Sequence, residues 1–375
     1  MEENARIKER LQRKAAQAGV PISGTFELTP RCNLSCRMCY VRMSPEEMKP
    51  YGRELTAREW ISLGEQATQS GMLFLLLTGG EPMLRPDFSE IYEAMSQMGP
   101  SISINTNGTM LSKQVRDLLE RRPPSQLNVT LYGPKAATYD TLCGSSCAFE
   151  KTMDTLRWAR DIGILLNVNI TVTPWNMDQI TELEALAERE NLHLRMTFYN
   201  FPPSRRNTKT DFSRIAAEDV GRMIAQRECR LQGVESLTVR ANSILKSVLS
   251  CPERQNSGIS EGEGISCFAG RSQFWVAWNG EMTPCGMLDV PKTAPLSEGF
   301  QASWEKIKQE TARIRLCSDC ISCKERDTCF NCAAVMCTET GSFEGRPDYM
   351  CRLNHAYREE IILLAEKARS VGNGR

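Results

Sequence analysis

The chain has 375 residues, of which 46 are basic, 46 are acidic and 16 are cysteine. This length allows one large α/β domain with an appended module, and it is enough to bury a sizeable core. Because the basic and acidic side chains balance, no field of one sign favours nucleic acid or an anionic membrane as a partner.

The N-terminal residues 1–20 are charged and helix-prone, and they lack the apolar stretch of a secretory signal. No apolar run in the sequence approaches the ~20 residues that a membrane-spanning helix needs. We therefore expect a cytoplasmic protein that does not span a membrane.

Beyond residue 20, the predicted strands and helices alternate. An apolar run closed by Gly79 and Gly80 is typical of a strand buried on both faces, and Thr56 with Glu59 forms a capping box that opens a helix. Strands are expected at residues 22–28, 72–77, 101–105, 127–132, 165–172 and 194–199, and helices between them at residues 57–69, 88–98, 112–121, 149–162 and 177–190. Six such units predict an α/β fold with a parallel sheet, wound as a partial (β/α)6 TIM-like barrel.

After the sixth strand the composition changes, with Pro and Arg concentrated in residues 201–211. Residues 212–250 predict a bridging helix, a short strand at Ser236–Val239 and a further helix. We therefore divide the chain into an N-terminal helix (1–20), a barrel core (21–210), a bridging region (211–250) and a small cysteine-rich domain (251–375).

The cysteines fall in two groups, residues 32–39 and residues 251–351, with only Cys143, Cys147 and Cys229 between them. A reducing cytosol keeps thiols free, so dense cysteines there indicate metal or cluster ligands rather than disulfides. Two groups predict two metal-bearing modules. The three cysteines between them are expected to be buried structural thiols, although Cys143 and Cys147 could also form a redox pair or bind a metal.

The first group is Cys32-x3-Cys36-x2-Cys39, placed where the first strand ends. Three thiolates at this spacing fit one loop and can point at one inorganic centre, but they are one ligand short of the usual four. The alternative is half of a zinc site completed elsewhere. Thr78-Gly79-Gly80-Glu81-Pro82 follows the second strand, and ligands of parallel α/β folds sit at this carboxyl edge.

Together these two motifs resemble the radical S-adenosylmethionine (SAM) enzymes. In that family three cysteines hold a [4Fe–4S] cluster whose open iron chelates SAM, and an external donor such as flavodoxin or ferredoxin supplies the electron. SAM is then cleaved to a 5′-deoxyadenosyl radical that abstracts hydrogen. The resemblance implies a SAM-binding set of Tyr40, Thr78, Gly79, Gly80, Glu81, Asn105, Thr106 and Thr130, with Asn107 beside them. It assigns no catalytic acid or base.

The second cysteine group resembles the SPASM extension of radical SAM enzymes, which holds two auxiliary [4Fe–4S] clusters. The resemblance implies one cluster on Cys320, Cys323, Cys329 and Cys351, and another on Cys267, Cys285, Cys332 and Cys251. Cys337 is an alternative to Cys332, and Cys317 has no assigned role. A zinc ribbon is the alternative interpretation of the Cys-x2-Cys pairs. Phe274, Trp275 and Trp278 are expected to pack around this module as core and not to form a substrate cage.

By this resemblance the chain is a maturase that installs a thioether, carbon–carbon or related crosslink in a ribosomally made peptide. Since about twenty residues precede the first strand, recognition of a peptide leader would need a separate protein. Sulfatase maturation is one alternative, but Asn242 stands about where its carboxylate base is expected. Tetrapyrrole chemistry of the heme-biosynthesis type is another alternative, and a non-catalytic electron-transfer protein is a third.

Overall fold

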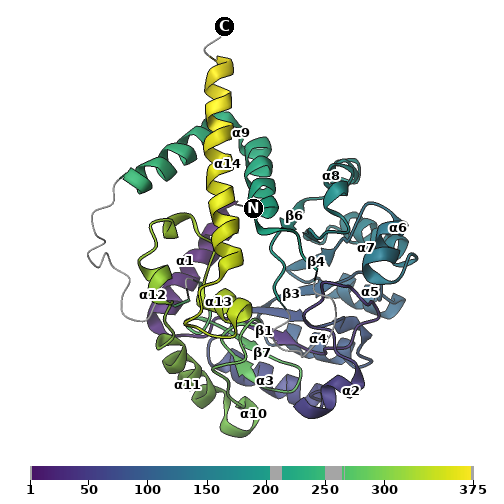
Figure 1. Ribbon diagram of the computed structural model, residues 1–375. Helices are drawn as coiled ribbons and strands as arrows, with labels where there is room; N and C mark the ends of the chain where they lie inside the picture. Colours follow the sequence, from purple (N-terminus) through teal and green to yellow (C-terminus); the bar gives the residue numbers. More distant parts are fainter. Residues whose placement is uncertain (1, 203–212, 250–263, 266, 373–375) are drawn as a thin grey trace. The chain divides into compact units, whose positions relative to one another are not determined.

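The computed structural model describes residues 2–202, 213–249, 264–265 and 267–372 (Figure 1). The chain divides into two compact units. Unit 1 contains residues 1–212 and 267–312, and unit 2 contains residues 213–266 and 313–375. The four-part division expected from the sequence stays a prediction, because compactness alone does not say which segments act together.

Unit 1 is built on one open sheet with the strand order β6-β5-β4-β3-β2-β1-β7-β8. The first seven strands are parallel, and only β8 runs antiparallel to its neighbour. The strands are β1 (Ser23–Glu27), β2 (Phe74–Thr78), β3 (Ser101–Thr106), β4 (Gln126–Thr130), β5 (Leu166–Thr171), β6 (Leu194–Thr197), β7 (Gln273–Val276) and β8 (Met282–Thr283). The six predicted strands and the open, barrel-like α/β architecture are therefore confirmed.

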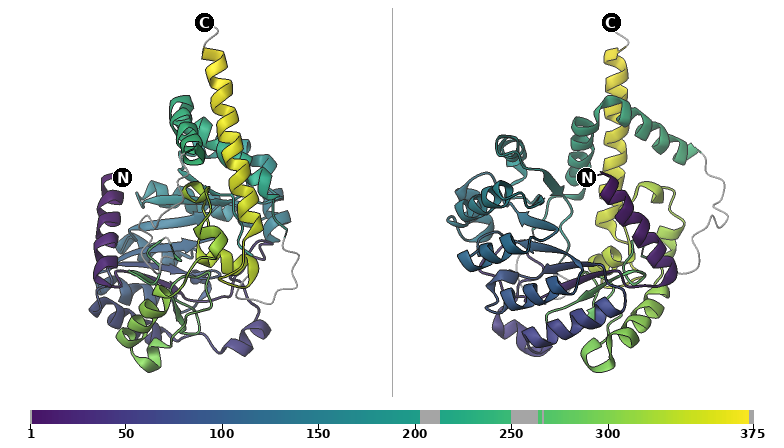
Figure 2. Two further views of the ribbon diagram at one scale, coloured as in Figure 1. Left: turned by 60° about the vertical axis from the view of Figure 1, so that its left-hand side comes forward. Right: turned by 180° about the vertical axis from the view of Figure 1, so that it is seen from behind.

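The helices of unit 1 connect the strands and cover the outer face of the curved sheet (Figure 2). They are α1 (Glu2–Ala18), α2 (Pro45–Met48), α3 (Ala57–Gln69), α4 (Phe88–Gln97), α5 (Lys113–Arg121), α6 (Ala136–Cys143), α7 (Ala148–Asp161), α8 (Ile180–Arg189), α10 (Pro295–Glu298) and α11 (Phe300–Ala312). Single turns of 3-10 helix add η1 (Lys49–Tyr51), η2 (Pro82–Leu84) and η3 (Met177–Gln179). The predicted capping box is present, since Thr56 and Glu59 bond reciprocally at the start of α3.

The aromatic run at residues 274–278 packs against the sheet of unit 1 as well as against the segment that follows it. Phe274 is buried on β7, where its ring centroid lies 5.0 Å from that of Phe300 on α11 and 6.4 Å from that of Phe26 on β1. Apolar side chains stabilise whichever surface they can bury against, and here that surface is the edge of the sheet beside β1. Phe274 and Trp278 are buried, as expected of core residues, and Phe274 contacts Phe300 of the cysteine-rich segment, whereas Trp275 lines the unit 1 cavity.

Unit 2 is helical and contains α9 (Ala217–Leu249), α12 (Ser318–Ile321), η4 (Arg326–Thr328), α13 (Ala333–Thr340) and α14 (Asp348–Gly372). Helix α9 packs along α14, and Gly233 interrupts it with φ 77° (Figure 1). The strand predicted at Ser236–Val239 is wrong. Its β-branched residues favour a strand, but Leu237, Ala241 and Ile244 recur at helical spacing and are buried against α14.

None of the helices in the described part of the chain has the length and apolar character needed to cross a membrane.

Candidate functional site

A cavity of about 340 Å³ opens at the carboxyl ends of the parallel strands of unit 1. All seven of these strands contribute to its wall, through Glu27, Thr78, Asn105 and Thr106, Thr130, Asn169 and Thr171, Thr197, and Trp275. Ligands of parallel α/β folds bind at this edge because the connecting loops meet there. The structure thus brings together, around one cavity, all of the SAM-binding residues expected from the sequence except Glu81.

Cys32, Cys36 and Cys39 lie in the loop after β1 and line the same cavity. Backbone N–H groups of Leu34 and Arg42 donate to the sulfurs of Cys32 and Cys39 at 3.4 and 3.3 Å. Thiolates that receive such bonds are held in place as ligands. The three thiols therefore fit a common inorganic centre facing the cavity.

Gly79 and Gly80 let the loop after β2 approach the cysteine loop closely. A Cβ atom on Gly79 would lie 2.3 Å from the carbonyl oxygen of Thr29, and one on Gly80 would lie 2.3 Å from that of Arg31. Gly79 also has φ 150°, a conformation that other residues rarely adopt. The Gly80 N–H donates to Thr29 O at 2.7 Å, so glycine is required here for contact between the two motifs.

Glu81 is fully buried and ties the end of β2 to the end of β3. Its carboxylate accepts hydrogen bonds from Thr106 Oγ1 at 2.9 Å and from the backbone N–H of Asn107 at 2.8 Å. Burial raises the pKa of Glu81 to about 7, while these hydrogen bonds lower it. Because Glu81 lies behind the cavity wall, its geometry suits positioning of Thr106 and Asn107, and its predicted role as a direct counter-charge stays a prediction.

Sequence reasoning missed several residues of the wall. The Glu27 side chain is buried at the end of β1 and accepts a hydrogen bond from Trp275 Nε1 at 3.1 Å. Further polar or aromatic wall residues come from β5, from β6 and from the segments that follow β4 and β6, namely Tyr132, Asn169, Thr171, Thr197, Tyr199, Asn200 and Phe201. The strand residues among them could have been found from the sequence, because they stand at the carboxyl end of a predicted strand. Nothing in the sequence, however, showed that β7 returns Trp275 to β1.

Cys143 lies directly against the cysteine loop. Its carbonyl oxygen accepts a hydrogen bond from the Ser35 N–H at 3.0 Å, and its thiol forms a hydrogen bond with the thiol of Cys36. This thiol contact lowers the pKa of Cys36 and raises that of Cys143. The buried structural role expected for Cys143 agrees with its 1% exposure, whereas Cys147 is exposed.

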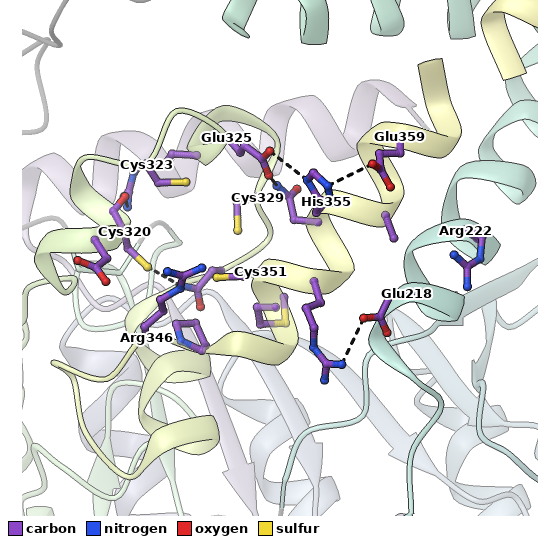
Figure 3. Close-up of a pocket in the computed structure, with 18 residues that line it drawn as sticks. Glu218, Arg222, Cys320, Cys323, Glu325, Cys329, Arg346, Cys351, His355 and Glu359 are labelled. Carbon is purple, nitrogen blue, oxygen red and sulfur yellow. Dashed lines mark hydrogen bonds and ion pairs between the residues drawn. The ribbon is translucent and has the colours of Figure 1, made fainter. Parts of the chain in front are cut away.

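Unit 2 has its own cavity, of about 490 Å³ (Figure 3). Cys320, Cys323 and Cys329 reach it from α12 and the loop beyond, and Cys351 reaches it from the first turn of α14. Burial raises the pKa of Cys320 to about 12 and raises that of Cys329 as well. Buried thiols of this kind ionise when a cationic centre binds them.

Glu325 joins the cysteine loop of unit 2 to α14. Its carboxylate accepts from Asn354 Nδ2 at 3.2 Å, lies 3.4 Å from His355 Nδ1, and lies 3.8 Å from Arg358 Nε. Arg358 is only 3% exposed and also donates to Thr328 Oγ1 at 2.8 Å. These contacts hold the loop that carries Cys323 and Cys329 against the helix that carries Cys351.

The structure does not bring the other predicted ligand set together within one unit. Cys267 and Cys285 belong to unit 1, Cys332 and its alternative Cys337 belong to unit 2, and Cys251 lies outside the described residues. This set therefore stays a prediction. Asn242, in the position considered for a carboxylate base, is exposed on α9 and accepts from Arg369 at 2.8 Å.

Within the described ranges, no group of three or more His, Cys, Asp or Glu side chains is arranged to hold a single metal ion.

An open parallel α/β sheet that presents a cysteine loop, a glycine turn and polar side chains around one cavity defines a class of metal-dependent enzyme. The comparison with family models identifies the class, since residues 26–187 match the model of the Radical SAM superfamily. Residues 26–187 therefore form a radical SAM domain, and a cysteine-rich region follows it toward the C-terminus.

Curated relatives include both tetrapyrrole and peptide enzymes. The AdoMet-dependent heme synthase of Methanosarcina barkeri is 26% identical, over 88% of this chain and 95% of that protein. The Antilisterial bacteriocin subtilosin biosynthesis protein AlbA of Bacillus subtilis is 25% identical, over 77% of this chain and 59% of that protein.

Solved structures share the fold. Streptococcus suis SuiB is 17% identical, with a TM-score of 0.66 over 93% of this chain and 81% of that chain. The structure of anSMEcpe with bound AdoMet is also 17% identical, with a TM-score of 0.67 over 93% of this chain and all of that chain. At this identity the likeness shows the fold alone.

Proposed function

We propose that the chain cleaves SAM and modifies a ribosomally synthesised peptide by hydrogen abstraction, forming a thioether, carbon–carbon or related crosslink. The observation that carries the proposal is the cavity of unit 1 around which the cysteine loop, the glycine turn and the polar ends of seven strands meet. It would hold a cofactor and present a substrate at the same edge of the sheet.

In this proposal Cys32, Cys36 and Cys39 hold a [4Fe–4S] cluster, and SAM occupies the adjoining wall. The cluster and SAM together supply a one-electron cleavage that yields a carbon radical able to abstract hydrogen. The donor set fits, since three thiols leave one coordination position open. The electron comes from an external donor such as flavodoxin or ferredoxin.

In this proposal the chain's own residues bind SAM and orient it. Carbonyl groups of the Gly79-Gly80 turn suit a cationic amino group, and side chains of Asn105 and Thr130 suit hydroxyl and carboxylate groups. Glu81 holds Thr106 and Asn107 in position through the hydrogen bonds described above. Preorganised polar groups of this kind reduce the ordering cost of binding.

Two auxiliary [4Fe–4S] clusters complete the proposal. Cys320, Cys323, Cys329 and Cys351 would hold one of them, and their common cavity supports this assignment. Cys267, Cys285, Cys332 and Cys251 would hold the other, a set supported only by spacing.

A peptide substrate is supported by the relatives and by the chemistry of the wall. The curated relatives include AlbA, named for bacteriocin biosynthesis, and PqqA peptide cyclase of Bradyrhizobium diazoefficiens, named for its action on a peptide. Among the described residues that line the unit 1 cavity there is no lysine or arginine, while amide and hydroxyl groups are abundant. Such groups match a peptide backbone, which is polar and uncharged. A separate peptide-recognition protein would bind the leader.

A second candidate is tetrapyrrole side-chain chemistry. It is favoured by coverage, because three AdoMet-dependent heme synthases are matched over 84–95% of their own length, compared with 59% for AlbA. A tetrapyrrole with ionised propionates ordinarily takes cationic partners. The described wall of the unit 1 cavity offers none.

The two candidates are separated by one pair of experiments. Reduced, cluster-loaded protein is incubated with SAM and with a peptide encoded beside its gene, and the peptide mass is followed. In parallel, a propionate-bearing tetrapyrrole is titrated into the protein and its Soret band is monitored. We expect a mass change in the peptide and no saturable Soret shift. Tight tetrapyrrole binding without peptide modification would overturn the proposal in favour of the second candidate.

A further inference from the structure

Three of the four cysteines in the unit 2 cavity receive hydrogen bonds from two residues outside the cysteine set. Asn331 Nδ2 donates to Cys320 Sγ at 3.5 Å, and the backbone N–H of Asn331 donates to Cys329. The Arg346 guanidinium bonds to Cys351, and Figure 3 shows it beside Cys351 and Cys320. The sulfurs are therefore surrounded by N–H donors, one of which carries a full positive charge.

The acidic groups of this cavity are largely paired away from the sulfurs. Glu218 pairs with Arg352 at 3.2 Å, and Glu359 pairs with His355 at 3.2 Å. Near Arg346, Asp348 lies 3.7 Å from its Nε and offsets part of its charge. A second guanidinium, that of Arg326, also lines the cavity and donates to Cys320 O at 3.4 Å. Asp319, next to Cys320, also lines the cavity and acts on Arg346, so the positive charge that reaches the sulfurs is local, at the contact between Arg346 and Cys351.

The orientation of Asn331 leaves one of its own atoms unsatisfied. With Nδ2 directed at Cys320, its Oδ1 is buried without a hydrogen-bond partner among the described residues. Buried acceptors without partners are uncommon and tend to occur where a side chain has a functional task. This makes an incidental contact between the amide and the sulfur a poor explanation.

We propose that Arg346 and Asn331 are positioning residues that raise the reduction potential of the cluster held by Cys320, Cys323, Cys329 and Cys351. The inference rests on the proposed function, which places a cluster there. Reduction adds negative charge to a cluster and its sulfurs, and hydrogen bonds and positive charge nearby stabilise the reduced state. With both residues in place, the unit 2 cluster is more easily reduced than its four cysteines alone would make it.

The test is a potentiometric titration of the full-length, cluster-loaded protein, followed by electron paramagnetic resonance. The variants are Arg346→Gln, Arg346→Lys and Asn331→Ala. Arg352→Gln is the matched control, because it removes one charge from the same cavity at a residue paired with Glu218. Iron content and circular dichroism are measured for every variant.

We expect Arg346→Gln and Asn331→Ala each to make reduction of one cluster about tenfold less favourable, which is about 59 mV for a one-electron couple. Arg346→Lys should recover part of the loss, and Arg352→Gln should change little. Because Arg346 is largely exposed, the wild-type potential should also fall as salt screens its charge, and this readout still applies if a variant loses its cluster.

Unchanged potentials in folded, loaded Arg346→Gln and Asn331→Ala would overturn the inference. So would a wild-type potential insensitive to salt, or an equal shift in Arg352→Gln. Failure of the proposed function is seen separately, because Cys320→Ala would then contain as much iron as the wild type.

Discussion

The two cysteine centres are built in different ways. The first is local, with Cys32, Cys36 and Cys39 in one loop whose own backbone N–H groups bond to two of the sulfurs. The second is assembled by tertiary structure, because Cys351 belongs to α14 while the other three cysteines lie outside it. The contacts of Glu325 with α14, here called the Glu325 network, hold these cysteines near Cys351. A local centre depends on the loop sequence, whereas an assembled centre depends on packing and buried charge.

This contrast separates two functions. The local centre shares its cavity with the predicted SAM-binding residues, so in the proposed function cleavage of SAM would depend on unit 1. The assembled centre has a cavity within unit 2 and charged residues that suit tuning of an electron carrier. Substitutions at the two centres should therefore differ in kind as well as in size.

The largest expected effect follows removal of the local centre. Changing Cys32, Cys36 and Cys39 together to Ala should abolish SAM cleavage, because no iron would be left to chelate SAM. Iron content should fall from about twelve to about eight atoms per chain, as expected for one lost [4Fe–4S] cluster of three. Iron analysis and chromatographic detection of 5′-deoxyadenosine check this. Stoichiometric zinc, or four irons in the wild type, would contradict the three-cluster assignment.

Removal of the assembled centre should uncouple the reaction. Cys351→Ala should abolish formation of modified peptide while 5′-deoxyadenosine is still released, because SAM cleavage needs only unit 1. Mass spectrometry of the peptide and the nucleoside assay measure the two outcomes in one reaction. Product formation at the normal rate by a folded variant that lacks this cluster would make the module a structural appendage.

Substitution of Arg358, which is buried beside Glu325 in unit 2, should have the next largest effect on stability. Arg358→Met should destabilise unit 2 by about 2 kcal/mol, the size expected when a buried charged donor to Thr328 is removed and the half-exposed Glu325 loses a neighbouring cation. The matched control is Arg157→Met, whose exposed pair with Glu190 should be worth less than about 1 kcal/mol. Urea unfolding of both variants measures the difference, and equal effects would show that the Glu325 network does not hold the assembled centre together.

Glu81 should give unit 1 a pH-dependent stability. Its pKa in the folded protein is raised from 4.5 to about 7, so folding is favoured when the carboxyl is protonated. This contribution is complete below pH 4.5 and is lost as the pH rises through 7, amounting to about 3 kcal/mol at about 1.36 kcal/mol per pKa unit.

The comparison is between the wild type and Glu81→Gln, which does not titrate. Unfolding free energies from urea titrations should show the wild type losing stability relative to the variant between pH 4.5 and 7. Glu59→Gln is the control, because hydrogen bonds from Arg53 lower the pKa of Glu59 to about 2 and leave no slope in this window. If the difference in unfolding free energy between the wild type and Glu81→Gln did not change with pH, the carboxylate would be ionised throughout this range.

The sequence predicted what depends on short segments. The six alternating strands, the capping box at Thr56 and the cysteine and glycine motifs at one sheet edge all follow from local patterns and strand polarity. The features that could not be predicted from the sequence depend on contacts between segments that are far apart in the chain. The pairing of β7 with β1 brings Trp275 to Glu27, and the packing of Leu237 against α14 turns a strand-like stretch into helix. No local pattern encodes either contact.

The central claim is that the two centres have separable roles, and one measurement tests it most directly. Folded Cys320→Ala protein, loaded with the remaining clusters, is supplied with SAM and a strong reductant without peptide, and 5′-deoxyadenosine is quantified. We predict release at the wild-type rate, with none above background from the triple Cys32, Cys36 and Cys39 variant. Loss of cleavage in Cys320→Ala protein that retains its fold and about eight irons would contradict the claim.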